Sequence, residues 1–304
     1  MSDRATVEVL TPEVGGAVAL GGMRRIGSPS IWRRFAKNRL AVAGLVILAA
    51  LALVVTVGPL VIPADKVTAQ VRTATFAPPS RDAWFGRDEF GRDALVRAIY
   101  GGRISLGISF VAAIVTTIIG VLLGIVSGYA GGIADAIVDR FVELILTLPF
   151  LLLLILAAAV APPSATSIVL ILGLFGWPVL ARLVRGEFVA LKHREFIEAA
   201  RACGASNARI VFVHILPNAV APIVVTATLI VATNLIAEAT ISFLGLGIHP
   251  PTPSWGNMLT EAQRYLIQSP FLAVFPGMLI LITVLCVNLL GDGLRDALDP
   301  RQKR

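Results

Sequence analysis

Histidine, serine and acidic residues are the first candidates for chemistry in this chain of 304 residues, and their spacing argues against catalysis. The three histidines, His193, His214 and His249, lie too far apart to show metal-ligand spacing. There is no Ser/His/Asp set with catalytic spacing, no H-E-x-x-H pair and no phosphate-binding G-x-x-x-x-G-K-[ST] loop. We therefore predict no catalytic residue and no metal or cofactor site in this chain.

Polar side chains within apolar stretches are the next candidates, because such groups are costly in lipid and face a protein interior or water. Asn234 and Glu238 lie four residues apart, on one face of a helix, and Asn288 lies in the last apolar stretch. These three residues are candidates for lining a translocation pathway. For Glu238 a structural role fits equally well, in which it hydrogen-bonds the turn S-F-L-G-L-G that follows it.

Long apolar segments must position these groups. The composition is 56% hydrophobic and only 15% charged, and a soluble domain of this length would carry more charge. Six stretches are long enough to cross about 30 Å of hydrocarbon as helices. They are 40–62, 104–128, 141–161, 165–181, 218–243 and 271–291. The sequence therefore predicts an all-α membrane protein with six transmembrane helices.

Basic residues fix the expected orientation of these helices. Most of the 26 Lys and Arg residues precede the first stretch, follow the fourth or follow the last, so both termini should be cytoplasmic. The net charge of +7 is explained by this topology, and we expect no nucleic-acid partner. Cys203 in a cytoplasmic loop and Cys286 in the last span should form no disulfide, and we interpret both as packing residues. The first stretch lacks a cleavage site and should remain as an anchor.

Two exterior segments and one glycine pattern complete this organisation. Apolar residues recur at helical spacing over 88–103, which predicts an amphipathic helix on the outer surface. The Gly- and Pro-rich segment 245–270 is long enough for a short helix that dips back toward the membrane. Gly120, Gly124 and Gly128 repeat every four residues, which favours close packing against a neighbouring helix over contact with substrate.

An ordered cytoplasmic loop follows the fourth stretch, where a short turn would suffice. Apolar residues recur at helical spacing up to Cys203, Gly204 is suited to a helix C-terminus, and a second helical segment, 205–215, ends at Leu216-Pro217. Glu198 is spaced to pair with Arg194 and Arg201. On physical grounds alone, docking of this projection on a partner protein and packing on its own membrane domain are equally good explanations.

The loop resembles the EAA motif of permease subunits of bacterial ABC importers. The resemblance is carried by Glu198-Ala199-Ala200-x3-Gly204 and a following stretch that ends Ile215-Leu216-Pro217, with His214 at a usually hydrophobic position. Further similarity to the C-type permease of the dipeptide/oligopeptide/nickel subfamily lies in F-G-R-D-x2-G-R-D at 85–93, E-x3-S-F-L-G-L-G at 238–247 and G-D-G-L-R-D-x2-D-P at 291–300. Only residues 1–30 lie outside the match.

The resemblance implies a type I ABC importer transmembrane domain with cytoplasmic coupling helices. It implies that this chain is non-catalytic, forms half of a translocation pathway with a homologous permease, and couples to two subunits that bind ATP and Mg²⁺. An extracytoplasmic binding protein would deliver the substrate. The implied ATPase-coupling residues are Glu195, Glu198, Ala199, Ala200, Arg201, Gly204, Leu216 and Pro217. Peptide is the favoured substrate, with nickel chelate, glutathione or oligosaccharide as alternatives.

The expected organisation is a cytoplasmic tail over 1–30, an anchor helix and exterior loop over 31–103, a permease domain over 104–293 and a cytoplasmic tail over 294–304. The expected location is the bacterial inner membrane, with membrane lipid around the helices. A rival class, an ATP-independent secondary transporter, predicts inverted repeats or paired broken helices with buried acids. No such pattern is visible in the sequence, and that class leaves the ordered cytoplasmic loop without a purpose.

Overall fold

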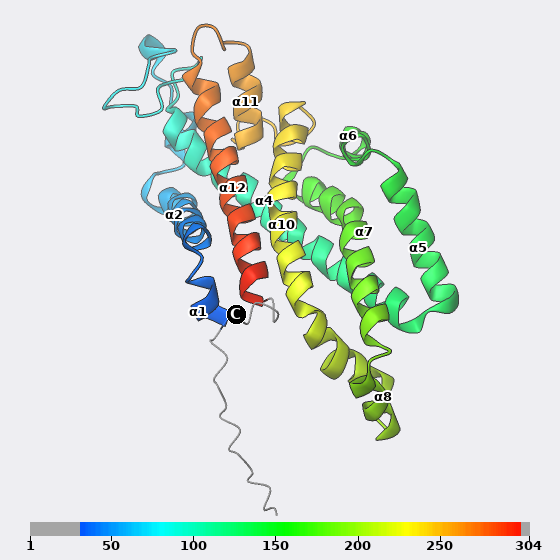
Figure 1. Cartoon of the computed structure of the whole chain (residues 1–304). Helices are drawn as coiled ribbons and strands as arrows, with labels where there is room; N and C mark the ends of the chain where they lie inside the picture. The colour runs from blue at the N-terminus through cyan, green and yellow to red at the C-terminus, as the bar shows by residue number, and fades with distance from the viewer. Residues whose placement is uncertain (1–30, 299–304) are drawn as a thin grey trace, which may run out of the picture.

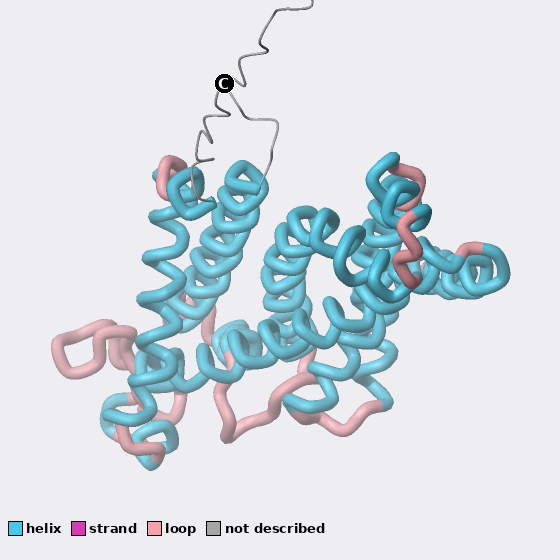
Figure 2. The backbone as a smooth tube through the Cα atoms, turned by 90° about the horizontal axis from the view of Figure 1, so that it is seen from below, coloured by secondary structure: helices cyan, strands magenta, loops and turns pink. Residues whose placement is uncertain are grey.

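The computed structural model describes residues 31–298, which fold into helices and loops (Figures 1 and 2). In order, the longer helices are α2 (Arg39–Val61), α4 (Ala94–Ile125), α5 (Gly132–Thr147), α6 (Phe150–Val160), α7 (Ala165–Leu191), α8 (Glu195–Ala202), α10 (Leu216–Phe243), α11 (Trp255–Gln263) and α12 (Phe271–Leu298). Short elements are α1 (Ile31–Phe35), α3 (Asp65–Thr68), η1 (Arg72–Ala74), the π-helical turn η2 (Val126–Ala130), α9 (Asn207–Arg209) and the π-helical η3 (Ile210–Ile215). The predicted all-α class is confirmed.

Five helices are long and apolar enough to cross a membrane, and a bent pair supplies the sixth segment. The predicted third span, 141–161, is not one straight helix, because α5 and α6 meet at an angle of 89°. The break falls at Leu148 and Pro149, where proline lacks the amide donor that would continue the helix and disfavours the α conformation in the residue before it. The predicted span is therefore a broken segment with α6 lying across one end of the bundle (Figure 1).

The separate amphipathic helix predicted over 88–103 is wrong. The segment 88–93 is a loop, and Asp93 caps a helix that runs without interruption from Ala94 into the membrane. The Asp93 carboxylate accepts hydrogen bonds from the amides of Leu95, at 2.8 Å, and Val96, at 3.2 Å. The helical spacing was real, but it belongs to the first turns of the second span.

Glycines bring the C-terminal turns of α4, and the turn η2 that follows, into close contact with the C-terminal half of α7. A Cβ atom on Gly120 would lie 3.0 Å from Leu180 Cβ, one on Gly124 would lie 2.6 Å from Val184 Cβ, and one on Gly128 would lie 2.7 Å from Phe188 Cβ. The three glycines share the helix face that α7 covers. Their interpretation as a packing face is confirmed.

One end of the bundle is closed by residues 245–270 together with the 88–92 loop and the start of α4, which we call the cap. It contains the short helix expected in 245–270. Ser254 begins α11 with a reciprocal capping box that involves Asn257. The side chain of Trp255 is fully buried, and its Nε1 donates to the carbonyl of Ala98 on α4 at 2.9 Å. The predicted short helix is confirmed, and it packs against α4.

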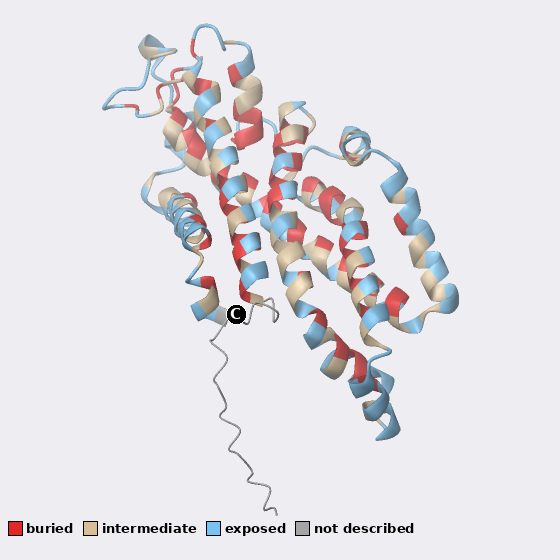
Figure 3. Cartoon of the chain, viewed as in Figure 1, coloured by how far each residue is buried: buried red, intermediate tan, exposed pale blue. Residues whose placement is uncertain are grey.

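The opposite end of the bundle gathers α1, the end of α12 and α8 (Figure 1). Helix α12 continues to Leu298, so residues 294–298 of the predicted C-terminal tail are helical, and residues 299–304, like the predicted tail over 1–30, lie outside the described part. Between the two ends, α5 contributes a single fully buried residue, Val142, and leaves most of its surface exposed (Figure 3). Its exposed apolar residues include Ile133, Ile137, Phe141 and Leu144.

The glycine contacts predict a position-dependent effect of added volume. Gly124→Val places side-chain atoms within α7 and should destabilise the folded chain by about 1–3 kcal/mol through overpacking. Thermal unfolding of the detergent-solubilised chain should show a lower midpoint. Gly107→Val is the matched control, because Gly107 lies on the same helix with nothing within 4 Å of a built Cβ. Equal midpoints for the two variants would contradict the packing role.

Candidate functional site

The segment that connects α7 to α10 projects the short helix α8 beyond the end of the bundle (Figure 1). Acidic Glu195 and Glu198 lie in its first turn and Arg201 lies in its last, so the charges complement the helix dipole. Gly204 follows with φ of +82°, and the amide of Ala205 donates to the carbonyl of Ala200 at 3.0 Å. This termination requires the left-handed conformation that glycine adopts without strain.

One face of α8 packs against the rest of the protein, and the other face is exposed. Ile197 is fully buried in a cluster with Phe188 of α7 and with Ile210 and Ile215 of η3. Of the predicted coupling residues, Glu195, Glu198, Ala199, Arg201, Gly204 and Pro217 are exposed, whereas Ala200 and Leu216 are half-buried. Phe196 is also exposed, at 44%, although the sequence reasoning did not select it; an aromatic residue between two glutamates is the signal that was available. Helix α8 therefore presents a charged surface with one aromatic group, held by a single buried side chain.

Several details of this loop differ from the prediction. The second helical segment does not end at Leu216-Pro217, because α9, η3 and α10 form one continuous helix over Asn207–Phe243. Pro217 lies in the first turn of α10. Within residues 31–298, no ion pair within 4.0 Å includes Glu198, so its predicted pairing with Arg194 and Arg201 is wrong. Cys203 is exposed and so is not a packing residue, whereas Cys286 is buried; both thiols are free.

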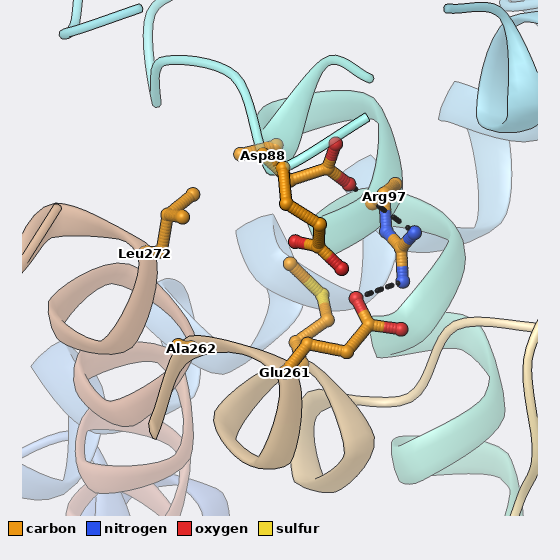
Figure 4. Close-up of a pocket in the computed structure, with 8 residues that line it drawn as sticks. Asp88, Arg97, Glu261, Ala262 and Leu272 are labelled. Atoms are coloured by element: carbon orange, nitrogen blue, oxygen red, sulfur yellow. Dashed lines mark hydrogen bonds and ion pairs between the residues drawn. The ribbon is translucent and has the colours of Figure 1, made fainter. Parts of the chain in front are cut away.

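A buried ion-pair cluster in the cap was not predicted (Figure 4). Arg97 on α4 is 2% exposed, and its guanidinium lies 2.8 Å from Glu261 of α11 and 3.4 Å from Asp88. Arg92 pairs with the same two carboxylates, at 2.5 Å from Asp88 and 3.2 Å from Glu261. The cluster joins the 88–92 loop, α4 and α11. Because Glu261 lies far from the other members in the sequence, spacing alone gave no signal for it.

The carboxylates of Asp88, Glu89 and Glu261 lie within 4.8 Å of one another. Two arginines already neutralise Asp88 and Glu261, so the group is explained as an ion-pair cluster without a cation. Burial raises the pKa of the Glu89 carboxyl, and the neighbouring Asp88 and Glu261 add to this effect. The cluster is thus a structural connection within the cap.

Comparison with known proteins identifies the family. Residues 120–304 match the family described as "Binding-protein-dependent transport system inner membrane component", and residues 30–79 match the N-terminal TM domain of oligopeptide transport permease C. The chain belongs to this family of inner-membrane transport components. It is a permease subunit of an ABC importer, and such subunits are non-catalytic transmembrane components.

Named relatives of this permease span nearly its whole length. The dipeptide permease protein DppC of Alkalihalophilus pseudofirmus is 39% identical over 90% of this chain and 89% of the relative. The oligopeptide permease protein OppC of Bacillus subtilis is 40% identical over 91% and 92%. The glutathione permease protein GsiD of Salmonella typhimurium is 42% identical over 90% of each chain.

Among solved structures, the MetNI methionine ABC transporter in an inward facing conformation shares the fold of this permease. The TM-score is 0.54 at 22% identity, over 68% of this chain and 97% of that one. This match supports the predicted type I importer fold. Membership of the family excludes the rival class of ATP-independent secondary transporters.

The structure places two of the three candidate pathway residues inside the permease. Asn234 is 2% exposed, and its Nδ2 lies 3.5 Å from the carbonyl of Ser109. Glu238 is fully buried and accepts a hydrogen bond from Ser242 Oγ at 2.9 Å, and Ser242 Oγ lies 3.4 Å from the amide of Ile248. This geometry supports the structural alternative for Glu238. Asn288 is exposed on α12, and pathway lining stays a prediction for all three residues.

The cap cluster predicts that loss of one arginine is costly. Arg97→Gln removes a buried guanidinium and leaves Asp88 and Glu261 with less compensation, which should cost about 3–5 kcal/mol. Thermal unfolding of the solubilised permease measures the loss. Arg103→Gln, at an exposed position on the same helix, should leave the midpoint close to that of the wild type. A small shift for Arg97→Gln would contradict the stabilising role of the cluster.

Proposed function

We propose that α8 is the surface on which an ATPase subunit of the importer docks. The supporting observation is that α8 projects from the bundle with its charged surface exposed, while Ile197 fixes it to the cluster that joins α7 and η3. A helix that only packed on its own domain would bury more than one side chain in eight residues. The EAA-like spacing of Glu198, Ala199, Ala200 and Gly204 supports the same assignment.

In the proposed assembly, this permease pairs with a homologous permease so that the two together enclose the pathway. Two ATPase subunits bind ATP and Mg²⁺, each docks on one permease, and a binding protein delivers substrate to the cap. Closure of the ATPase pair moves the docked helices together and switches the membrane helices between outward- and inward-facing states. Both termini lie on the cytoplasmic side with α8, and lipid surrounds the exposed apolar helices.

The substrate proposed for this permease is a peptide. The relatives at about 40% identity are named for dipeptide, oligopeptide and glutathione transport, and all three names denote compounds with amide bonds. Glutathione, nickel chelates and oligosaccharides are the alternatives.

Reversal of one charge on α8 tests the docking. In the importer assembled with its cognate subunits, Glu198→Lys should lower the amount of copurified ATPase roughly tenfold, the effect of about 1.4 kcal/mol. The reason is that a lysine in the first turn opposes the helix dipole and reverses the charge of the exposed surface. Substrate-stimulated ATP hydrolysis in proteoliposomes should fall in parallel.

The matched control is Asp292→Lys, because Asp292 is an exposed acid near the end of α12, at the same end of the bundle as α8 (Figure 1). This control should retain ATPase binding and hydrolysis. Retention of both activities by Glu198→Lys as well would contradict the docking assignment.

Calorimetry on the importer's own binding protein tests the substrate class. We expect dipeptides, tripeptides or longer peptides to bind with a Kd of about 10⁻⁶ M or lower, which corresponds to a binding free energy of about −8.2 kcal/mol or stronger. Glutathione, a nickel chelate and an oligosaccharide, measured in the same buffer, should bind more weakly or give no heat of binding. Tight binding of any of these three compounds, without binding of other peptides, would refute the proposal.

A further inference from the structure

The π-helical turn η2, at the end of α4, contacts the chain on both sides of α8. Lys192, just after α7, donates through Nζ to the carbonyl of Gly128 at 3.1 Å. Tyr129 donates through its hydroxyl to Oδ1 of Asn207, the first residue of α9, at 2.7 Å. Since α8 lies between Lys192 and Asn207, the same turn is tied to the segment that enters α8 and to the segment that leaves it.

An ion pair extends this connection to α5. Arg185 of α7 holds Asp135 of α5 in a two-bond geometry, with Nε 2.6 Å from Oδ1 and Nη2 2.8 Å from Oδ2. Ser127 of η2 also donates to the Asp135 carboxylate. Two parallel bonds from a guanidinium fix orientation as well as distance. The first turn of α5 is thereby set relative to both η2 and the end of α7.

Apolar packing also joins η2 to α7 and to the cluster that anchors α8. A Cβ atom on Gly128 would lie 2.7 Å from Phe188 Cβ, so η2 lies directly against α7. Tyr129 packs on the cluster that also holds Ile197 of α8 and Ile210 of η3. Helix α8 has one buried anchor, and that anchor lies in the cluster that η2 borders.

The ion pair contributes more to geometry than to stability. Its side chains are 24% exposed for Asp135 and 35% exposed for Arg185, and pairs as open to solvent as this contribute little to the free energy of folding. A shared carboxylate that accepts from both η2 and α7 nevertheless restricts how α5 turns relative to α7. Loss of the ion pair should therefore weaken the coupling of movements between α7 and α5, with little change in the free energy of unfolding.

We propose that Ser127, Tyr129, Asp135, Arg185, Lys192 and Asn207 form a brace that fixes α8 relative to α4 and α5. These are positioning residues, so a displacement of α8 by a docked ATPase moves the ends of α4 and α5 with it. The brace rests on the proposed function of α8 as the docking surface. Its rigidity, however, is a property of this chain and is measurable without an ATPase.

Spin labels measure that rigidity directly. Native Cys203 is exposed at the end of α8, and Ile137→Cys adds a second label at an exposed position of α5, with Cys286→Ala removing the buried thiol. Pulsed electron resonance should give one narrow distance distribution for the solubilised permease, unchanged in the importer with and without trapped nucleotide. Arg185→Gln should broaden that distribution, because α7 then loses the guanidinium that holds the Asp135 carboxylate of α5.

Transport supplies the second readout. In proteoliposomes, the number of substrate molecules transported per ATP hydrolysed should fall roughly five- to tenfold for Arg185→Gln, while the amount of copurified ATPase stays at the wild-type level. The exchanged pair Asp135→Arg with Arg185→Asp should recover part of the loss, because it restores opposite charges at the same two positions. Arg140→Gln is the matched control, since it removes the exposed pair with Glu143, which lies entirely within α5.

The brace would be overturned by a narrow distance distribution in Arg185→Gln, by a wild-type ratio of substrate transported to ATP hydrolysed in that variant, or by an equal fall of that ratio in Arg140→Gln. A loss of transport accompanied by an equal loss of bound ATPase would also overturn it, because the residue would then act on docking itself. Failure of the wild-type importer to retain ATPase through α8 would instead refute the proposed function. The label distances in the isolated permease would still decide whether α8 and α5 are held together.

Discussion

The contact between α4 and α7 through Gly120, Gly124 and Gly128 is the constraint on which the rest of this permease depends. In lipid, apolar side chains gain little by leaving one hydrocarbon environment for another, so helices associate where small residues let their backbones approach. The contact runs through the last two turns of α4 and continues into η2. It therefore fixes the end of α7 at Phe188, and through Phe188 the cluster in which α8 is anchored.

Sequence reasoning located the membrane helices because apolar length is a direct consequence of hydrocarbon thickness. It failed where a boundary depends on tertiary contacts. Arg97 lies within the segment 88–103 that was predicted to be a surface helix, yet it is buried by partners in a loop and in α11, one of them Glu261. A charged residue that is paired with a residue far away in the sequence can lie inside a helix span and so does not mark its end. The sequence pattern within 88–103 does not reveal such a partner.

In the candidate site, too, features set by the local sequence could be predicted, whereas features that depend on tertiary contacts could not. Gly204 and the helical spacing before it were sufficient to predict α8 and its end, because the left-handed residue at a helix terminus is a local requirement. Helical spacing was not sufficient to predict an ion pair of Glu198. Spacing brings opposite charges within reach on a helix, but an exposed ion pair gains little free energy when it forms. The bend at Leu148 and Pro149 did have a local signal, the proline itself, but the prediction used only the length of the apolar stretch.

Rigidity at α8 has a thermodynamic consequence for any partner that binds it. Ordering a mobile segment on binding costs free energy that the contacts must first offset, so a surface held in place before docking binds more tightly for the same contacts. Helix α8 has only eight residues, and an isolated helix of that length is unstable in water. Its order therefore comes from the buried side chain of Ile197, from the left-handed turn at Gly204 and from the neighbouring helices.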